Sequence, residues 1–425
     1  MTAKISTVTA RMILDSRGIP TVEATVTAEH GAGTASVPAG TSRGIHEAKE
    51  LRDGDRRWNG QGVRKAVSHV NVEINRALRG RDAADQAAID ALLRELDRTK
   101  RSGLGANALL AVSLAALRLA AAAAKRPLWR HLTDDPPRHL PVPMLNLLNG
   151  GAHADNDLAI QEFQVLPFGF DTFSEALRAG TEIYQALGSI LTDRELGTGV
   201  GLEGGFAPRI DSHLTALDLL MQAVERAGYR PGEQVALGLD VAASDFYHDG
   251  GYRFNRHVLN AEQLATEYET LAQRYPLVSL EDPYAEDDWA GWQALQGRVD
   301  LQLVGDDLTV TDATRIVRGA EEAGISAVIL KPNQVGTFSE ADAARNAARK
   351  QGLAAVASNR SRETTDDWIA DLAVAWGANF IKAGAPARGE RVVKYNRLLA
   401  IEQELGGQAV YRGRDALVTT GARHG

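Results

Sequence analysis

Three acidic residues in the C-terminal part of the chain each follow a short apolar segment directly. They are Asp240 after residues 235–239, Glu281 after residues 277–280 and Asp306 after residues 301–305. A ligand set of carboxylate oxygens selects a hard cation, and a site that retains waters favours Mg²⁺ over zinc. The chain contains no cysteine, which excludes a thiolate metal site. The three acids therefore predict a magnesium site, although for any single acid helix capping is an equally good interpretation.

Two lysines occupy equivalent positions. Lys331 follows residues 327–330, and Lys382 follows residues 379–381. A lysine is rare at the end of a buried strand unless it is paired. We expect the nearby Mg²⁺ and the second lysine to lower the pKa of such an ammonium toward that of a general base. Three acids together with two lysines favour a catalytic site over a set of unrelated helix caps.

The apolar segments that carry these residues recur at a regular spacing. Each is an uninterrupted run of mainly Val, Ile, Leu, Ala or Gly, which is typical of a buried parallel strand. Polar residues follow the segments at positions 240, 281, 306, 331, 359 and 382, so the gaps are 41, 25, 25, 28 and 23 residues. Each gap accommodates one helix and two loops. This rhythm predicts an α/β fold with a (β/α)8 barrel, whose chemistry lies at the C-terminal ends of its strands.

The N-terminal part of the chain has a different pattern. Residues 3–29 alternate apolar and polar side chains, which predicts half-buried antiparallel strands, and a hairpin is expected around residues 31–33. Residues 61–130 are predicted to be helical. The alanine-rich stretch 106–124 is expected to be a buried helix, because Arg118 interrupts it as a membrane span.

Two prolines among polar residues mark a domain boundary at residues 133–138. The residue before a proline favours extended backbone, so this segment is expected to be a linker. The predicted regions are an α+β N-terminal domain at 1–133, a linker at 134–139 and a catalytic barrel at 140–425. The first barrel strands are expected at residues 143–148 and 163–166.

The composition excludes several classes of partner. The 425 residues carry a net charge of −8, and no long run of Lys and Arg suggests a nucleic-acid surface. Residues 1–11 contain no apolar segment of the kind found in signal peptides, and the lack of cysteine fits a reducing compartment. We therefore expect a cytoplasmic protein that binds neither nucleic acid nor a membrane.

Several longer motifs are specific enough to indicate a family. They read Asp15-Ser16-Arg17-Gly18, Pro20-Thr21-Val22-Glu23, Glu50-Leu51-Arg52-Asp53-Gly54-Asp55, Gly105-Ala106-Asn107-Ala108, Asn149-Gly150-Gly151 with His153, Gln161-Glu162-Phe163, Glu203-Gly204-Gly205 and Ile381-Lys382-Ala383-Gly384-Ala385-Pro386-Ala387-Arg388. With these motifs the chain resembles enolase over nearly its whole length. The resemblance implies an enolase-type barrel with atypical first strands and an α+β N-terminal capping domain. It also implies a hydro-lyase that converts 2-phosphoglycerate to phosphoenolpyruvate.

The resemblance further implies two Mg²⁺ per active site. The implied ligands are Asp240, Glu281 and Asp306 for the first ion and Ser42, on a mobile loop, for the second. Lys331 would be the base that removes the proton α to the substrate carboxylate. Lys382 and the cations would stabilise the dianion that forms.

The remaining motif residues would surround the substrate. Their implied roles are Glu203 as the acid that assists hydroxide departure, Glu162 as its support, Gln161 and His153 as substrate contacts, and Arg360 and Ser361 as the phosphoryl-binding pair. Taken singly, His153 or Arg360 would be interpreted as an ordinary polar surface residue. Only the surrounding motifs favour a functional role.

The chain departs from the enolase pattern in the segments expected to meet the substrate. Arg43 is new beside the metal-binding serine, Asn359 replaces a histidine, Arg362 replaces a glycine, and Leu202 replaces a carboxylate beside the acid. Neutral drift would explain single changes, but drift should not favour the substrate loops. Two added guanidiniums suit an additional carboxylate, which arginine binds bidentately.

We therefore interpret Arg43, Arg362 and Asn359 as substrate-binding residues of a specialised enolase paralogue. Its substrate would be a small acidic phosphorus compound related to 2-phosphoglycerate. The alternatives are a glycolytic enolase and, less favoured, a non-catalytic binding protein with the same fold.

The resemblance also implies a homodimer or higher homo-oligomer. Arg17 and Glu23 would lie at the subunit interface, although Ala400 replaces the arginine that enolases offer to this glutamate. Because one ion pair is a small part of an interface, its loss need not abolish pairing.

Overall fold

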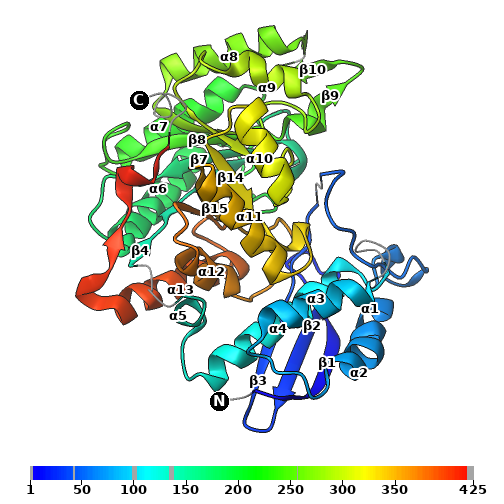
Figure 1. Ribbon diagram of the computed structural model, residues 1–425. Coiled ribbons are helices and arrows are strands. Elements are labelled where there is room, and N and C mark those ends of the chain that lie inside the picture. The colour runs from blue at the N-terminus through cyan, green and yellow to red at the C-terminus, as the bar shows by residue number, and fades with distance from the viewer. Residues whose placement is uncertain (1–2, 42–43, 98–102, 134–137, 256, 419–425) are drawn as a thin grey trace.

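The computed structural model describes residues 3–41, 44–97, 103–133, 138–255 and 257–418, and its N-terminal part is built on a three-stranded antiparallel sheet (Figure 1). The strands are β1 (Ile5–Leu14), β2 (Pro20–Ala28) and β3 (Gly31–Ser36). Val22, Ala24 and Val26 are fully buried, as the alternation predicted. The predicted hairpin position is wrong by two residues, because Gly31 already pairs with Ala28 and the turn lies at 29–30.

Helices cover one face of this sheet. They are η1 (Arg57–Gly60), α1 (Arg64–His69), the π-helical η2 (Val70–Ile74), α2 (Asn75–Leu78), α3 (Gln86–Leu96), α4 (Ala106–Ala123) and α5 (Leu128–His131). The helical region predicted at 61–130 is thus interrupted at 79–85 and 97–105. Helix α4 is long and apolar enough to cross a membrane, but 83% of it is buried inside the protein, where it packs on β2 and β3. Its apolar surface is therefore used in the core.

The second part of the chain forms a closed sheet. Within the described residues it has nine strands in the order β5-β16-β15-β14-β13-β12-β8-β7-β6. They are β5 (Val142–Pro143), β6 (Leu145–Asn149), β7 (Glu162–Leu166), β8 (Ala236–Asp240), β12 (Leu277–Glu281), β13 (Gln302–Gly305), β14 (Ala327–Leu330), β15 (Ala354–Ser358) and β16 (Phe380–Lys382). Only Met144 separates β5 from β6, so the two ends of the sheet are one continuous segment and the sheet closes.

The strand directions are those of an enolase-type barrel. Strands β8 and β12 to β16 run parallel, whereas β7 is antiparallel to both of its neighbours. The predicted α/β barrel with atypical first strands is therefore confirmed. Strands β8, β12 and β16 end at Asp240, Glu281 and Lys382, and β13 and β14 end one residue before Asp306 and Lys331.

Helices surround the barrel and leave the carboxyl ends of the strands free for loops. They are α6 (Phe173–Asp193), α7 (His213–Arg226), α8 (Ala261–Arg274), α9 (Trp289–Leu295), α10 (Ala313–Glu322), α11 (Phe338–Lys350), α12 (Trp368–Ala375) and α13 (Gly389–Leu405). The loops add the short elements η3 (Gly151–His153), η4 (Ala243–Phe246), η5 (Pro332–Gln334), η6 (Gly406–Gln408) and η7 (Gly413–Ala416) and the small sheets of β9 (Tyr247–His248), β10 (Gly251–Phe254) and β11 (His257–Leu259), and of β4 (His139–Leu140) and β17 (Val410–Tyr411).

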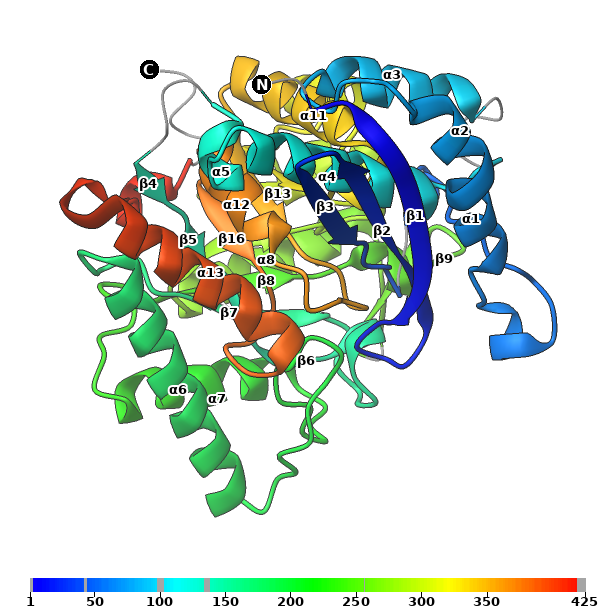
Figure 2. The same cartoon turned by 90° about the horizontal axis from the view of Figure 1, so that it is seen from below.

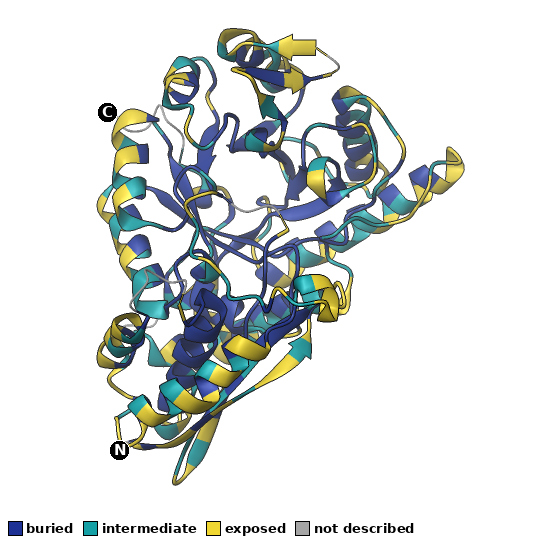
Figure 3. Ribbon diagram, turned by 90° about the vertical axis from the view of Figure 1, so that its right-hand side faces the viewer, coloured by how far each residue is buried: buried dark blue, intermediate teal, exposed yellow. Residues whose placement is uncertain are grey.

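The N-terminal part packs directly on the barrel. Helices α3 and α4 contact α11 (Figure 2), and buried strands occupy the centre of the barrel, whereas most of β1 is exposed or half-buried (Figure 3). Arg118 pairs with Asp366 at 2.6 Å, and the Ser36 amide donates to the same carboxylate at 2.8 Å. The limits 1–133, 134–139 and 140–425 for the domains and linker remain predictions.

Candidate active site

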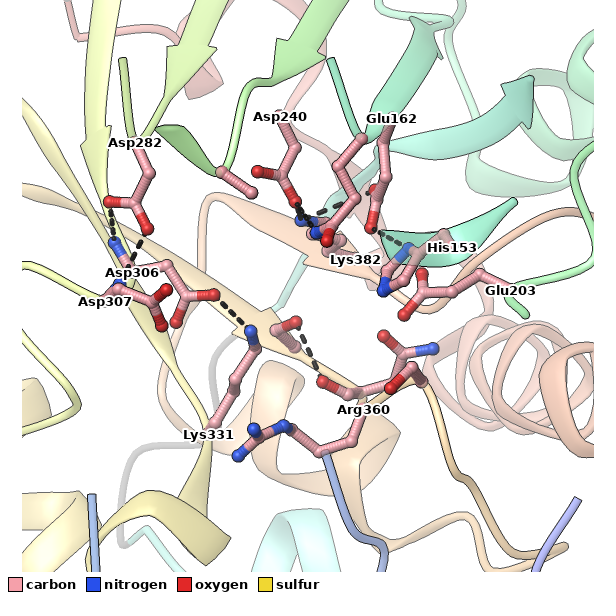
Figure 4. Close-up of a pocket in the computed structure, with 15 residues that line it drawn as sticks. His153, Glu162, Glu203, Asp240, Asp282, Asp306, Asp307, Lys331, Arg360 and Lys382 are labelled. Carbon is pink, nitrogen blue, oxygen red and sulfur yellow. Dashed lines mark hydrogen bonds and ion pairs between the residues drawn. The ribbon is translucent and has the colours of Figure 1, made fainter. Parts of the chain in front are cut away.

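A small cavity of about 20 Å³ lies at the carboxyl ends of the barrel strands (Figure 4). The predicted site residues that line it are His153, Gln161, Glu162, Glu203, Asp240, Asp306, Lys331, Asn359, Arg360, Ser361 and Lys382. Glu281 lies behind Lys382, which it contacts. Ser42 and Arg43 lie outside the described residues. Because about one water fills a cavity of this size, a substrate must displace some of the internal ion pairs or move the loops.

The three predicted metal ligands do not cap helices. The helices after β8, β12 and β13 are capped instead by Asn260, Asp288 and Asp312. Asp240, Glu281 and Asp306 are at most 7% exposed. Buried carboxylates without a capping role require another source of charge compensation.

Lys382 supplies part of this compensation. Its Nζ donates to Asp240 Oδ2 at 2.7 Å and to the two oxygens of Glu281 at 2.8 and 2.9 Å, and it lies 3.4 Å from Glu162 Oε2. Burial alone would lower the pKa of Lys382, but attraction by Asp240 and the two glutamates raises it well above its usual value. Lys382 is therefore a fixed positive charge among the acids.

Lys331 forms a second ammonium–carboxylate pair with Asp306. Burial, Arg360 and Lys382 all lower the pKa of Lys331, yet the attraction of Asp306 outweighs them and raises it. Lys382 thus lowers the pKa of Lys331 as expected, although Asp306 outweighs it, and the lowering by Mg²⁺ stays a prediction. Gln334 Nε2 also donates to Asp306 Oδ1 at 2.9 Å, so two donors fix the carboxylate.

The pocket contains more carboxylates than the lysines neutralise. Asp282, Asp306 and Asp307 bring oxygens within 4.8 Å of one another. Burial, followed by repulsion from Asp306, raises the pKa of Asp282 to about 8, and burial with repulsion from both neighbours raises that of Asp307 well above its usual value. Since a cation would offset this poorly solvated negative charge, the residues fit a hard metal ion. Asp240 and Glu281 lie outside this cluster, and Lys382 binds their oxygens.

His153, Glu162 and Glu203 form a second cluster. Their ligand atoms lie within 4.8 Å of one another, and His153 Nδ1 is 3.5 Å from Glu162 Oε1. Burial lowers the pKa of His153 to about 4, so its ring is neutral at neutral pH. Burial and the charge of Glu203 raise the pKa of Glu162 well above its usual value. Against the effect of burial, Arg391 and other cations lower the pKa of Glu203. The two carboxyls are therefore close enough for their charges to affect each other's pKa.

Arg360 is held by a residue of the N-terminal part. Its Nη1 and Nη2 donate to the two oxygens of Glu47 at 2.8 and 3.0 Å, and Nη1 also donates to Asn333 Oδ1 at 3.0 Å. Next to it, Ser361 Oγ accepts a hydrogen bond from the Thr41 amide at 2.9 Å. The segments on both sides of residues 42–43 therefore reach the pocket.

Two of the buried side-chain amides at this cavity each have an atom without a partner in the described structure. They are Asn359 Nδ2, a donor, and Gln161 Oε1, an acceptor. Both residues line the cavity. Gln161 uses its other amide atom to donate to Asp240 Oδ2 at 3.2 Å. An unpaired donor and an unpaired acceptor at the cavity wall are suited to a polar ligand.

The assignment of Arg362 to the substrate needs correction. Its buried Nε donates to Asp15 Oδ2 at 2.7 Å, and Arg362 does not line the cavity. Its backbone pairs with Ala39 in an extended bridge, in which successive side chains point to opposite sides. Because Ser361 faces the cavity, Arg362 faces the N-terminal part. Leu202 does not line the cavity either.

The sequence analysis did not single out Glu47, Asp282, Asp307 or Arg391. Asp282 and Asp307 each follow a predicted metal ligand directly, and this adjacency was a usable signal. Glu47 is 313 residues from Arg360, so no local pattern relates the two. Arg391 donates to the carbonyls of Arg360 and Ser361 at 2.7 Å. It lies on α13, and no sequence motif indicates which face of this helix is buried.

The fold and site together define a barrel protein with paired acids and lysines at its strand ends, a class suited to proton transfer on small acids. Residues 5–132 match the enolase N-terminal domain, and residues 137–420 match the enolase C-terminal TIM barrel domain. The chain belongs to the enolase family. Membership supports an enolase-type hydro-lyase activity and Mg²⁺ binding in general terms, and leaves the substrate to be argued from the site.

Proposed function

We propose that this protein is a Mg²⁺-dependent dehydratase that removes water from a 2-phosphoglycerate-like acid to give an enolpyruvate. The observation that carries the proposal is the arrangement of proton-transfer groups around one cavity. In Figure 4, Lys331 approaches the cavity from one side and Glu203 from another, with Lys382 bound among the acids. A non-catalytic binding protein would not need two buried lysines and two adjacent buried glutamates in one cavity.

The chain's own residues account for the proton movements. Neutral Lys331 would accept the proton from C2 of the substrate, and the Glu162–Glu203 pair would deliver its proton to the departing C3 hydroxyl as water, leaving a C2–C3 double bond. Lys382 would stabilise the negative charge that develops on the substrate carboxylate. Asp240, Glu281 and Asp306, with Ser42 for a second ion, would hold Mg²⁺, which would supply further stabilisation of that charge.

We further propose that the substrate is 2-phosphonoformylglycerate, as for carboxyphosphonoenolpyruvate synthase of phosphinothricin-type antibiotic biosynthesis. This compound resembles 2-phosphoglycerate with a carboxyl group on phosphorus, so the same elimination applies. With Arg362 bound to Asp15, the support comes from Asn359, whose unpaired amide donor lines the cavity, and from Arg43 in the sequence. A carboxylate at that position would gain the Arg43 guanidinium, which the typical enolase motif lacks, and an amide donor in place of the imidazole.

A comparison of kcat/KM for 2-phosphonoformylglycerate and 2-phosphoglycerate tests this proposal. The parent should prefer the former, and Asn359→His and Arg43→Thr should each shift the ratio toward 2-phosphoglycerate by about tenfold, the effect of one charge-assisted or buried hydrogen bond. Asn346→His, a change at an exposed asparagine, is the matched control. Efficient turnover of 2-phosphoglycerate, with no gain from the added carboxyl, would instead identify a divergent glycolytic enolase.

A further inference from the structure

A second, basic cavity of about 520 Å³ lies at the opposite end of the barrel strands. Its wall includes Ala355 near the start of β15 and Asn379 just before β16, whereas the candidate active site lies beyond the ends of these strands. Helices α11 and α12 both pack on β15 and flank it. The cavity is therefore separate from the site described above.

Three arginines line this cavity. Arg345 and Arg349 lie one turn apart on α11, so they share a helix face, and Arg412 precedes η7. The Nε atoms of Arg345 and Arg412 are buried and have no hydrogen-bond partner. Arg349 is exposed, and its side chain has no hydrogen bond or ion pair to a described residue.

Among the described residues, the acids beside these arginines leave part of their charge and donors uncompensated. Arg345 Nη2 donates to Asp342 Oδ1 at 2.8 Å, but that carboxylate also accepts from Trp376 Nε1 at 3.1 Å and from Asn346 Nδ2 at 3.0 Å. Arg412 uses Nη2 on the Gly377 carbonyl at 2.8 Å. Burial lowers the pKa of Arg412, and the attraction of Asp415 offsets this only in part. A buried donor without an acceptor is costly, and two such donors on guanidiniums that line the cavity favour an anion there.

A simpler reading is that basic residues in the last turn of α11 stabilise the helix end. This accounts for Arg349, which belongs to that turn, but not for Arg412 on another segment. It also leaves the two buried Nε atoms unexplained. We propose that this cavity binds the phosphate group of a small molecule, because guanidinium forks match the geometry of phosphate oxygens.

Trp376 provides a local reporter, since its indole lines the cavity. In ¹⁹F NMR of the full-length protein labelled with fluorotryptophan, assigned with Trp376→Phe, inorganic phosphate should shift the Trp376 resonance saturably. Chloride at equal ionic strength should not. In Arg349→Gln/Arg412→Gln the half-saturating phosphate concentration should rise at least about tenfold. Lys350→Gln is the matched control, because it removes a charge from the same helix but does not line the cavity.

Two results would overturn the proposal. One is the absence of a saturable Trp376 shift in the parent; a shift that then appears in Asp134→Asn/Asp135→Asn would show that acids of the chain itself neutralise the arginines. The other is an equal half-saturating phosphate concentration in the parent and the double variant. Arg349→Gln alone, at an exposed residue that has no partner among the described residues, should still weaken binding and guards against misfolding of the double variant.

Discussion

At the scale of single residues, the site is a set of buried charge pairs. The pairs Lys382–Asp240 and Lys331–Asp306 line the cavity at the strand ends, as does Arg360, which Glu47 holds. In each pair, at least one residue is implied in binding the substrate or a metal ion. A bound substrate or ion would have to replace the other residue of the pair or share it. The side chains of the site therefore hold one another in place, at an electrostatic cost that a bound ion or ligand would relieve.

Glu47 is predicted to be a positioning residue for Arg360. Glu47→Gln keeps a hydrogen-bond acceptor but removes the charge from the fork, so Arg360 should lose orientation toward the phosphoryl group. We expect KM to rise by roughly tenfold with a smaller change in kcat, the effect of one charge-assisted hydrogen bond.

Steady-state kinetics of Glu47→Gln beside Glu322→Gln, a surface change on α10, would check this expectation. An unchanged KM in Glu47→Gln would show that the pair only stabilises the fold.

At the scale of elements, the close contact between β3 and α4 depends on one glycine. A Cβ at Gly33 would lie 2.1 Å from the Ala115 carbonyl oxygen, whereas a Cβ at Gly31 would come no nearer than 3.7 Å to Leu119. Gly33→Ala should therefore lower the free energy of unfolding by about 1–3 kcal/mol or more, because backbone must shift to admit the methyl group.

Gly31→Ala is the matched control and should change the free energy of unfolding little. Denaturant unfolding of both variants measures the difference, and equal stabilities would contradict the packing described for this pair.

His213, at the start of α7, is predicted to make the free energy of unfolding depend on pH. Its Nε2 accepts from the amides of Ala159 and Ile160 at 3.0 and 3.3 Å, just before β7. Burial lowers the pKa of His213 from 6.5 to about 4. At a pH between these two pKa values, the His213 ring binds a proton in the unfolded chain but not in the folded chain. The contribution of His213 to the free energy of unfolding therefore falls as the pH drops from 6.5 to 4, and it is constant above pH 6.5 and below pH 4.

The loss attributable to His213 should approach roughly 3 kcal/mol at pH 4. Urea unfolding across this range should show a smaller pH dependence in His213→Gln than in the parent. His248→Gln, at an exposed histidine, should behave like the parent. Parallel curves for the parent and His213→Gln would mean that other groups cause the pH dependence.

At the scale of the whole molecule, a homodimer is predicted through the face that carries β1. This strand lies at the edge of its sheet, and Met12 and Leu14 are 42% and 52% exposed. Glu23 forms an ion pair with Arg11 of the same chain at 2.6 Å. The Glu23 carboxylate therefore has a positive partner even though Ala400 replaces the arginine that enolases offer to it.

Sedimentation at micromolar concentration should show a dimer, and Met12→Glu/Leu14→Glu should shift it to monomer. Val258→Glu, at an exposed apolar residue of β11, is the control and should remain dimeric. A parent that sediments only as a monomer would refute the prediction.

The sequence predicted the structure best where residues with distinctive side-chain chemistry also recur at a regular spacing. The polar residues at strand ends located the barrel strands, because buried parallel strands are apolar until the active-site face. The direction of Arg362 could not be predicted, since it depends on the bridge between Ala39 and the barrel loop. The Glu47–Arg360 pair, and the raised pKa of Lys331, likewise depend on contacts between segments that are distant in the chain.

The central claim is that Lys331 removes the C2 proton of a phosphoglycerate-like acid. NMR of 2-phosphonoformylglycerate and 2-phosphoglycerate in D₂O with Mg²⁺ measures exchange of this proton directly. The account predicts exchange by the parent, retention of exchange in Glu203→Gln although elimination is blocked, and a loss of at least about 10²-fold in Lys331→Ala. Undiminished exchange in Lys331→Ala, or no exchange of either acid by the parent, would contradict it.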